Sequence, residues 1–115
     1  MKPVGIHHVN LMFDDIDAAR AFYRDVMGFD EIERPDFGFP GLWFQMGAQQ
    51  LHMQPGTAPE TFQHFALEVD DLDAVLAELA SRGLDVTPSP TVDGAGKQAF
   101  LTDPTGNIIE LNQPR

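Results

Sequence analysis

Four side chains that could together hold a divalent metal ion stand at corresponding positions of a repeated sequence, and they are His8, Gln50, His64 and Glu110. Two imidazoles, a carboxylate and an amide carbonyl suit a divalent ion and leave two positions of an octahedron for water or a chelating substrate. The chain has no cysteine, so thiolate ligands, disulfides and a cysteine nucleophile are excluded. The competing interpretation makes all four ordinary polar residues of a sheet face and its rim.

The correspondence comes from a tandem repeat. Residues 8–18, HVNLMFDDIDA, match residues 64–74, HFALEVDDLDA, at a constant offset of 56 (64 − 8 = 56). Four extra residues near the end of the second copy then align Gln50-Leu51-His52 with Glu110-Leu111-Asn112. We therefore expect a single domain, residues 1–115, with a first module at 1–54, a linker at 55–61 and a second module at 62–115.

Each module is predicted to contain a strand, a helix and three more strands. Acidic pairs at 14–15 and 70–71 are typical of helix N-caps, and Gly28 and Gly83 are typical of helix ends. The DPTG sequence at 103–106 predicts a hairpin turn. Strands are expected at 6–13, 30–34, 41–46 and 49–54, and at 63–69, 85–88, 97–103 and 107–112. The predicted fold class is α+β, with two tandem βαβββ modules whose eight strands form a cup.

Side-chain alternation along the strands sorts the candidates by face. In the first strand His8, Asn10 and Met12 share one face, and the more apolar face that the helix should cover carries His7, Val9, Leu11 and Phe13. His8 and Asn10 are therefore expected to face the cup. At the last strand of each module, His52 and Asn112 share a face with the candidate ligands Gln50 and Glu110.

Several other residues remain open between a functional role and a structural one. His52 could orient a ligand or act as a general acid or base, or it could lie outside the site. Arg34 and Lys97 could close the cup or be solvated surface charges. Aromatic residues that could line an apolar pocket or belong to the core are Trp43, Phe44, Phe100 and the Phe37-Gly38-Phe39-Pro40 hairpin.

Composition narrows the choice of partners. Eighteen acidic residues against seven basic ones give a net charge of −11, which disfavours nucleic acid as a partner. The N-terminal sequence MKPVGIHHVN lacks the pattern of a signal peptide, and no run of residues is long and apolar enough for a membrane span. We expect a cytoplasmic protein that does not engage a membrane.

Three segments resemble the vicinal oxygen chelate superfamily: HHVNLMFDDIDAARAFYRDVMGF, QHFALEVDDLDA and FLTDPTGNIIEL. That superfamily includes glyoxalase I, methylmalonyl-CoA epimerase, fosfomycin-resistance thiol transferases, extradiol dioxygenases and bleomycin-binding proteins. The resemblance covers nearly the whole chain. It implies metal ligation by His8, His64 and Glu110, with Gln50 at a fourth ligand position, and a cup completed across a homodimer. The implied ion is divalent: zinc, nickel, manganese, cobalt or iron.

The function expected from these observations is that of a metal-dependent, glyoxalase-like lyase or isomerase whose small substrate chelates the ion through vicinal oxygens. Glu110 would be both a ligand and a proton shuttle, with His52 as a second catalytic candidate. Substrate contacts are assigned to Asn10, Lys97, Phe100 and Asn112. Two alternatives remain open: a non-haem Fe(II) extradiol-type dioxygenase using His8, His64 and Glu110, and a non-catalytic protein that binds small molecules such as drugs.

Overall fold

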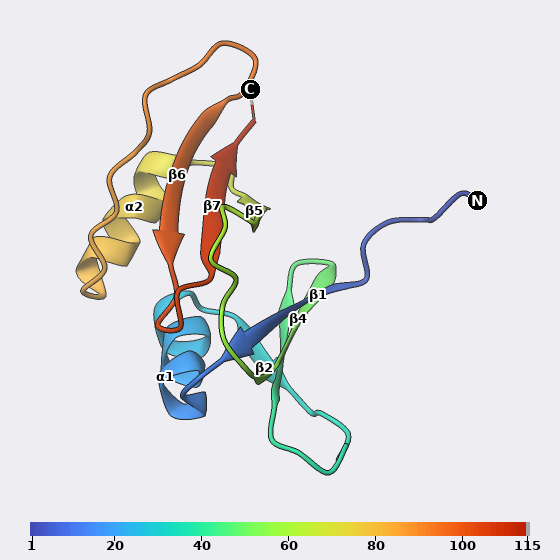
Figure 1. Ribbon diagram of the computed structural model, residues 1–115. Coiled ribbons are helices and arrows are strands. Elements are labelled where there is room, and N and C mark those ends of the chain that lie inside the picture. Colours follow the sequence, from blue (N-terminus) through green and yellow to red (C-terminus); the bar gives the residue numbers. More distant parts are fainter. Residues whose placement is uncertain (115) are drawn as a thin grey trace. The chain divides into compact units, whose positions relative to one another are not determined.

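The computed structural model of the protein describes residues 1–114 (Figure 1). The chain divides into two compact units, of which the first is residues 1–58 and the second begins at Pro59. Each unit has its own sheet and its own helical segment, so the predicted α+β class is confirmed. Within residues 1–114, no helix has the length and apolar character needed to cross a membrane.

The first unit is a four-stranded sheet in the order β1-β4-β3-β2. Strand β1 pairs with β4 in parallel, and the other neighbours pair antiparallel. In this register His8 lies opposite Gln50, and Asn10 lies opposite His52. The elements in chain order are β1 (His8–Phe13), α1 (Ile16–Arg20), η1 (Ala21–Val26), β2 (Asp30–Ile32), β3 (Leu42–Met46) and β4 (Gln49–Pro55).

The helical segment of this unit begins and ends where the sequence indicates. The Asp15 carboxylate accepts the backbone N–H groups of Asp17 and Ala18 at 3.0 and 3.1 Å, which confirms the predicted N-cap. From residue 21 onward the helix widens to π geometry, a change that the apolar spacing did not predict. The adjacent rings of Phe22 and Tyr23 are both buried there, because the wider turn lets both reach the core.

The second unit is a three-stranded sheet in the order β5-β7-β6, with β5 and β7 parallel and β6 antiparallel to β7. Its helix α2 lies on one side of this sheet (Figure 1). The Asp71 carboxylate caps that helix by accepting the Ala74 N–H at 3.1 Å. The elements are β5 (His64–Glu68), α2 (Leu72–Ser81), β6 (Lys97–Thr102) and β7 (Ile108–Gln113).

The turn between β6 and β7 confirms the prediction from the DPTG sequence. One carboxylate oxygen of Asp103 accepts the backbone N–H groups of Thr105, Gly106 and Asn107 at 2.8 to 3.0 Å. Asp103 is only 5% exposed. Gly106 has a φ of 104°, a conformation that residues with a side chain rarely adopt.

The prediction of a strand at 85–88 is wrong. In the described part of the second unit, the segment between α2 and β6 meets β6 only through the isolated Pro88–Ala99 bridge and a 2.8 Å hydrogen bond from Ser89 N to Gln98 O. Pro88 and Pro90 have no backbone N–H to donate, so a regular ladder cannot extend along this edge. The two sheets therefore have four and three strands in place of the predicted eight.

Each sheet buries one face, and the opposite face carries the polar candidates. In the first unit the buried set includes Phe44, Leu51 and Met53, each at most 1% exposed. In the second unit Ile109 and Leu111 play the same part. Because successive side chains of a strand point to opposite faces, the residues between them in sequence must lie on the other side of the sheet.

Candidate functional site

Three rings are stacked on the polar face of the first sheet. The rings of His8 and His52 lie 3.9 Å apart between centroids and 20° from parallel. The Trp43 ring lies 4.0 Å from the other side of His52, at 4°. The registers of β1, β4 and β3 bring these rings together, since His52 is the Cα partner of both Asn10 and Trp43. The stack leaves His52 half-buried between an imidazole and an indole.

Gln50 has its amide orientation set by its neighbours. The Gln45 amide nitrogen donates to the carbonyls of Gly47 and Gln49 at 2.9 and 3.0 Å, so the Gln45 carbonyl oxygen turns toward the Gln50 amide nitrogen, 3.4 Å away. The Gln50 carbonyl oxygen then lies 2.9 Å from His52 Nε2. Because that oxygen can only accept, His52 Nε2 carries the hydrogen and donates it.

The same surroundings keep His52 neutral. Burial, together with the nearby charges of His8, His7 and Arg34, lowers the pKa of His52 to about 4. At pH 7 the His52 ring is therefore a neutral imidazole, and its N–H orients the Gln50 amide. Of the roles that the sequence left open for His52, the contacts describe an orienting one.

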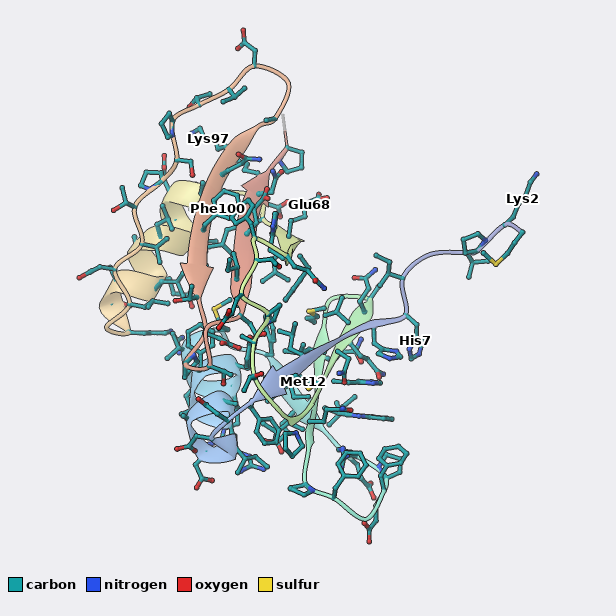
Figure 2. All side chains as sticks on the ribbon, viewed as in Figure 1. Lys2, His7, Met12, Glu68, Lys97 and Phe100 are labelled. Atoms are coloured by element: carbon teal, nitrogen blue, oxygen red, sulfur yellow. The ribbon has the colours of Figure 1, made fainter. Side chains whose placement is uncertain are left out.

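His7 does not lie where alternation placed it. The strand begins at His8 rather than at residue 6, so His7 precedes the pleated segment and is exposed instead of covered by the helix. Figure 2 marks it at the N-terminal end of β1. Its Nδ1 lies 3.0 Å from His8 Nδ1, a contact in which one ring donates and the other accepts.

The second sheet carries a buried carboxylate on its polar face. Glu110 is 7% exposed. Its Oε2 accepts hydrogen bonds from the amide nitrogens of Asn112 at 2.9 Å and Gln98 at 3.2 Å. Its Oε1 lies 3.1 Å from His64 Nε2. One oxygen is thus held by two amides, and the other faces a histidine.

The His64 ring is oriented by the backbone. Its Nδ1 lies 2.8 Å from the Phe62 carbonyl oxygen, which only accepts, so Nδ1 carries a hydrogen. In the neutral ring the Nε2 lone pair then faces the Oε1 lone pairs of Glu110. Two acceptors at 3.1 Å require a cation between them, either a proton on Nε2 or a metal ion.

The tautomer of His64 and its distance from Glu110 both fit a pair of metal ligands. A ligating histidine in proteins usually donates its other N–H to a carbonyl or carboxylate, as His64 does. With metal–ligand bonds of about 2.1 Å, neighbouring ligands of an octahedron lie about 3.0 Å apart. The 3.1 Å between His64 Nε2 and Glu110 Oε1 matches that spacing.

The residues expected to contact substrate fall into different settings. Phe100 is half-buried, with its ring 5.4 Å from His64, and Asn112 is bonded to Glu110. Asn10 is exposed on the His8 face. Lys97 is also exposed and lies 3.7 Å from Asp73 Oδ2, at the start of β6 (Figure 2).

Other aromatic candidates separate into core and surface. Phe44 is fully buried, so it belongs to the core rather than to a pocket. Phe37 and Phe39 are exposed, and the Arg34 guanidinium lies 4.9 Å from the centroid of each ring. Arg34 also donates to the Phe39 carbonyl at 3.0 Å. This arginine is therefore held by its own loop.

The structure brings the four candidate ligands together in pairs: His8 lies opposite Gln50 in the first unit, and His64 contacts Glu110 in the second. Among residues 1–114, no three histidine or carboxylate side chains are gathered to hold an ion by themselves. Sequence reasoning missed Gln98, although its alternation with Phe100 along β6 carried the signal. The Phe62 carbonyl that orients His64 has no sequence signal.

Comparisons with known proteins identify the family and support the fold. Residues 5–111 match the family described as the Glyoxalase/Bleomycin resistance protein/Dioxygenase superfamily. A crystal structure of a glyoxalase family protein from Bacillus anthracis is 28% identical, with a TM-score of 0.86 over 100% of this chain and 98% of that one.

Two curated relatives add detail. The metallothiol transferase FosB of Shouchella clausii is 28% identical over 94% of this chain and 79% of its own length. CFP32 of Mycobacterium tuberculosis, which carries a glyoxylase name, is 32% identical over 91% of this chain. The chain spans only 44% of the length of CFP32.

Proposed function

Since the chain belongs to the Glyoxalase/Bleomycin resistance protein/Dioxygenase superfamily, we propose that it is a divalent-metal-dependent, glyoxalase-like lyase or isomerase. Its substrate is a small molecule that chelates the ion through two neighbouring oxygens. The proposed ligands are His8, Gln50, His64 and Glu110. A metallothiol transferase among the relatives supports metal dependence.

One observation carries the proposal: the approach of His64 Nε2 to Glu110 Oε1 at 3.1 Å, while Nδ1 is tied to the Phe62 carbonyl. A structural histidine next to a buried carboxylate would normally direct an N–H toward it. Here the Nδ1 hydrogen is directed to the Phe62 carbonyl, so Nε2 and the carboxylate oxygen need a cation between them. A divalent ion resolves that arrangement, because both atoms are then its ligands.

When bound, the ion supplies Lewis-acid stabilisation of the negative charge that develops on the substrate oxygens. The chain's own side chains do the rest. Asn112 and Gln98 hold Glu110 Oε2, which leaves Oε1 to ligate or to accept a proton from the substrate. His52 donates to the Gln50 carbonyl oxygen and holds the amide in one orientation. The second lone pair of that oxygen is then free to bind the metal ion.

Metal titration tests the proposal. Chelator-treated protein is titrated calorimetrically with zinc, nickel, manganese, cobalt or Fe(II), and we expect one ion per ligand set. His64→Ala should abolish stoichiometric binding, whereas Glu68→Ala, which removes an exposed carboxylate outside the proposed set, should retain it. Wild-type affinity in His64→Ala would refute the ligand assignment. Retained iron with oxygen consumption would favour the dioxygenase, and tight ligand binding without any ion would favour a binding protein.

We also propose that the working form is a homodimer in which both copies contribute ligands. The proposal rests on the division of the ligands, one histidine and one oxygen donor in each unit. Light scattering at micromolar concentration tests the dimer, and a strict monomer would exclude it.

A mixed dimer then tests whether the ligands are shared. His8→Ala and His64→Ala chains should each fail to bind metal alone. If each ligand set joins His8 of one copy to His64 of the other, one of the two sets in a mixed dimer keeps both histidines, and about half of the wild-type metal content returns. If each set comes from a single chain, none returns.

A further inference from the structure

An open cavity of about 460 Å³ lies in the second unit, and its lining includes the Phe62 and Phe100 rings that flank His64. One wall is the polar face of the sheet, where Phe100 and Ile108 project. The other wall is the segment that follows α2, including Leu84 and Val86, and this segment runs alongside β6 (Figure 1). Phe62 lines the cavity as well. The volume lies within the usual range for small-molecule sites, roughly 300–1,000 Å³.

Aromatic contacts connect the cavity to the candidate ligands. The Phe62 ring lies 4.5 Å from the His64 ring and 5.2 Å from the Phe100 ring, between centroids. Phe100 is in turn 5.4 Å from His64 and is the Cα partner of Glu110. A molecule that fills the cavity therefore touches the same two phenyl rings that enclose His64.

The charge that lines this cavity is negative. Among its lining residues, all within the described part of the chain, the one charged side chain is Asp85. The apolar contribution comes from two phenylalanines, two leucines, a valine and an isoleucine, with threonine hydroxyls between them. Lys97, at the far end of β6, is directed to Asp73, and the chain as a whole carries −11. An anionic group would enter against this field, whereas a neutral apolar group would be desolvated at little cost.

We propose that this cavity binds an uncharged, apolar aromatic group, and that it discriminates against anions. The inference deepens the proposed function, since the occupant would be the part of the substrate that extends away from the ion. The cavity walls offer no cationic side chain that could pair with a phosphonate or a carboxylate.

Two fluorescent probes with one skeleton and different charge test the proposal: 1-N-phenylnaphthylamine, which is neutral, and 1-anilinonaphthalene-8-sulfonate, which is anionic. Both are titrated into the full chain in the presence of a chelator, so that the result does not depend on metal binding. We expect the neutral probe to saturate at one site per chain and the sulfonate to bind at least about tenfold more weakly. Equal affinities, or sulfonate preferred, would overturn the proposal.

Two substitutions locate the bound probe. Thr87→Trp places a ring in the cavity and should abolish binding of the neutral probe, while Thr91→Trp makes the same change at an exposed position outside the cavity lining. Asp85→Lys should strengthen sulfonate binding about tenfold, and Asp93→Lys, which alters net charge equally away from the lining, should not. Circular dichroism confirms folding of each variant. Probe binding that survives Thr87→Trp refutes the site, whatever the metal titration shows.

Discussion

Replacing Glu110 with glutamine should separate metal binding from folding. In the wild-type chain, one carboxylate oxygen accepts from Asn112 and Gln98, and the other faces His64 Nε2. A glutamine of the same shape keeps its carbonyl oxygen toward the two amide donors and turns its NH₂ toward the His64 lone pair. The number of hydrogen bonds is kept, because an N–H of the glutamine replaces the proton that the metal-free wild-type pair needs, and the buried carboxylate charge disappears. We expect the free energy of unfolding of the metal-free Glu110→Gln variant to stay within about 1 kcal/mol of wild type.

The effect on the ion should be large, because Glu110 is the one anionic ligand proposed. At an ion concentration of 100 times Kd, binding stabilises the folded wild-type chain by about 2.7 kcal/mol. If the substitution weakens binding about a hundredfold, the same ion concentration stabilises the variant by only about 0.4 kcal/mol. The variant therefore loses about 2.3 kcal/mol of metal-dependent stability while its metal-free stability is preserved.

Urea unfolding with chelator and with excess ion measures both quantities. Glu68→Gln is the matched control, since Glu68 is an exposed glutamate of β5 outside the proposed ligand set (Figure 2). It should retain the full metal-dependent stabilisation. The ligand assignment fails if Glu110→Gln is stabilised by the ion as strongly as wild type. A loss of more than about 2 kcal/mol in chelator would instead refute the hydrogen-bond exchange described for the variant.

Three further changes test other parts of the structure. The Gln50→Glu variant should bind metal at least as tightly as wild type but turn over a competent substrate more slowly, because the added carboxylate cancels positive charge that would stabilise a developing anion. Metal analysis and steady-state kinetics measure the two effects. No change in either would place Gln50 outside the ligand set. Phe44→Ala should lower the free energy of unfolding, measured in urea, by about 3–5 kcal/mol, whereas Phe37→Ala at an exposed position should lower it by about 0.5 kcal/mol. Similar losses in the two variants would contradict the difference in burial. Asp103→Ala should cost about 1–3 kcal/mol because three backbone N–H groups lose their acceptor, and Asp103→Asn, which keeps an acceptor oxygen, should cost less.

The sequence by itself determined the features that depend on neighbouring residues. The acidic caps Asp15 and Asp71 could be identified because a carboxylate at that position reaches backbone N–H groups two or three residues ahead. Alternation along strands likewise separated His8 from the buried Phe13, and Glu110 from Leu111. For Glu110 the sequence predicted only part of the outcome. Strand alternation predicted which face of the sheet it lies on, and the repeat grouped it with His64, but no local pattern indicated that it would be only 7% exposed.

Only the tertiary structure decided the features that depend on residues distant in sequence. The missing strand at 85–88 depended on whether Pro88 could join a ladder with β6, which its lack of an N–H prevents. The stacking of Trp43 on His52 required the pairing of β3 with β4. The hydrogen on His64 Nδ1 is set by the backbone carbonyl of Phe62, and a carbonyl is present at every residue, so no residue type could have indicated it. Residue types predict which side chains can donate or accept, but the distances that select one partner arise only when the strands pair.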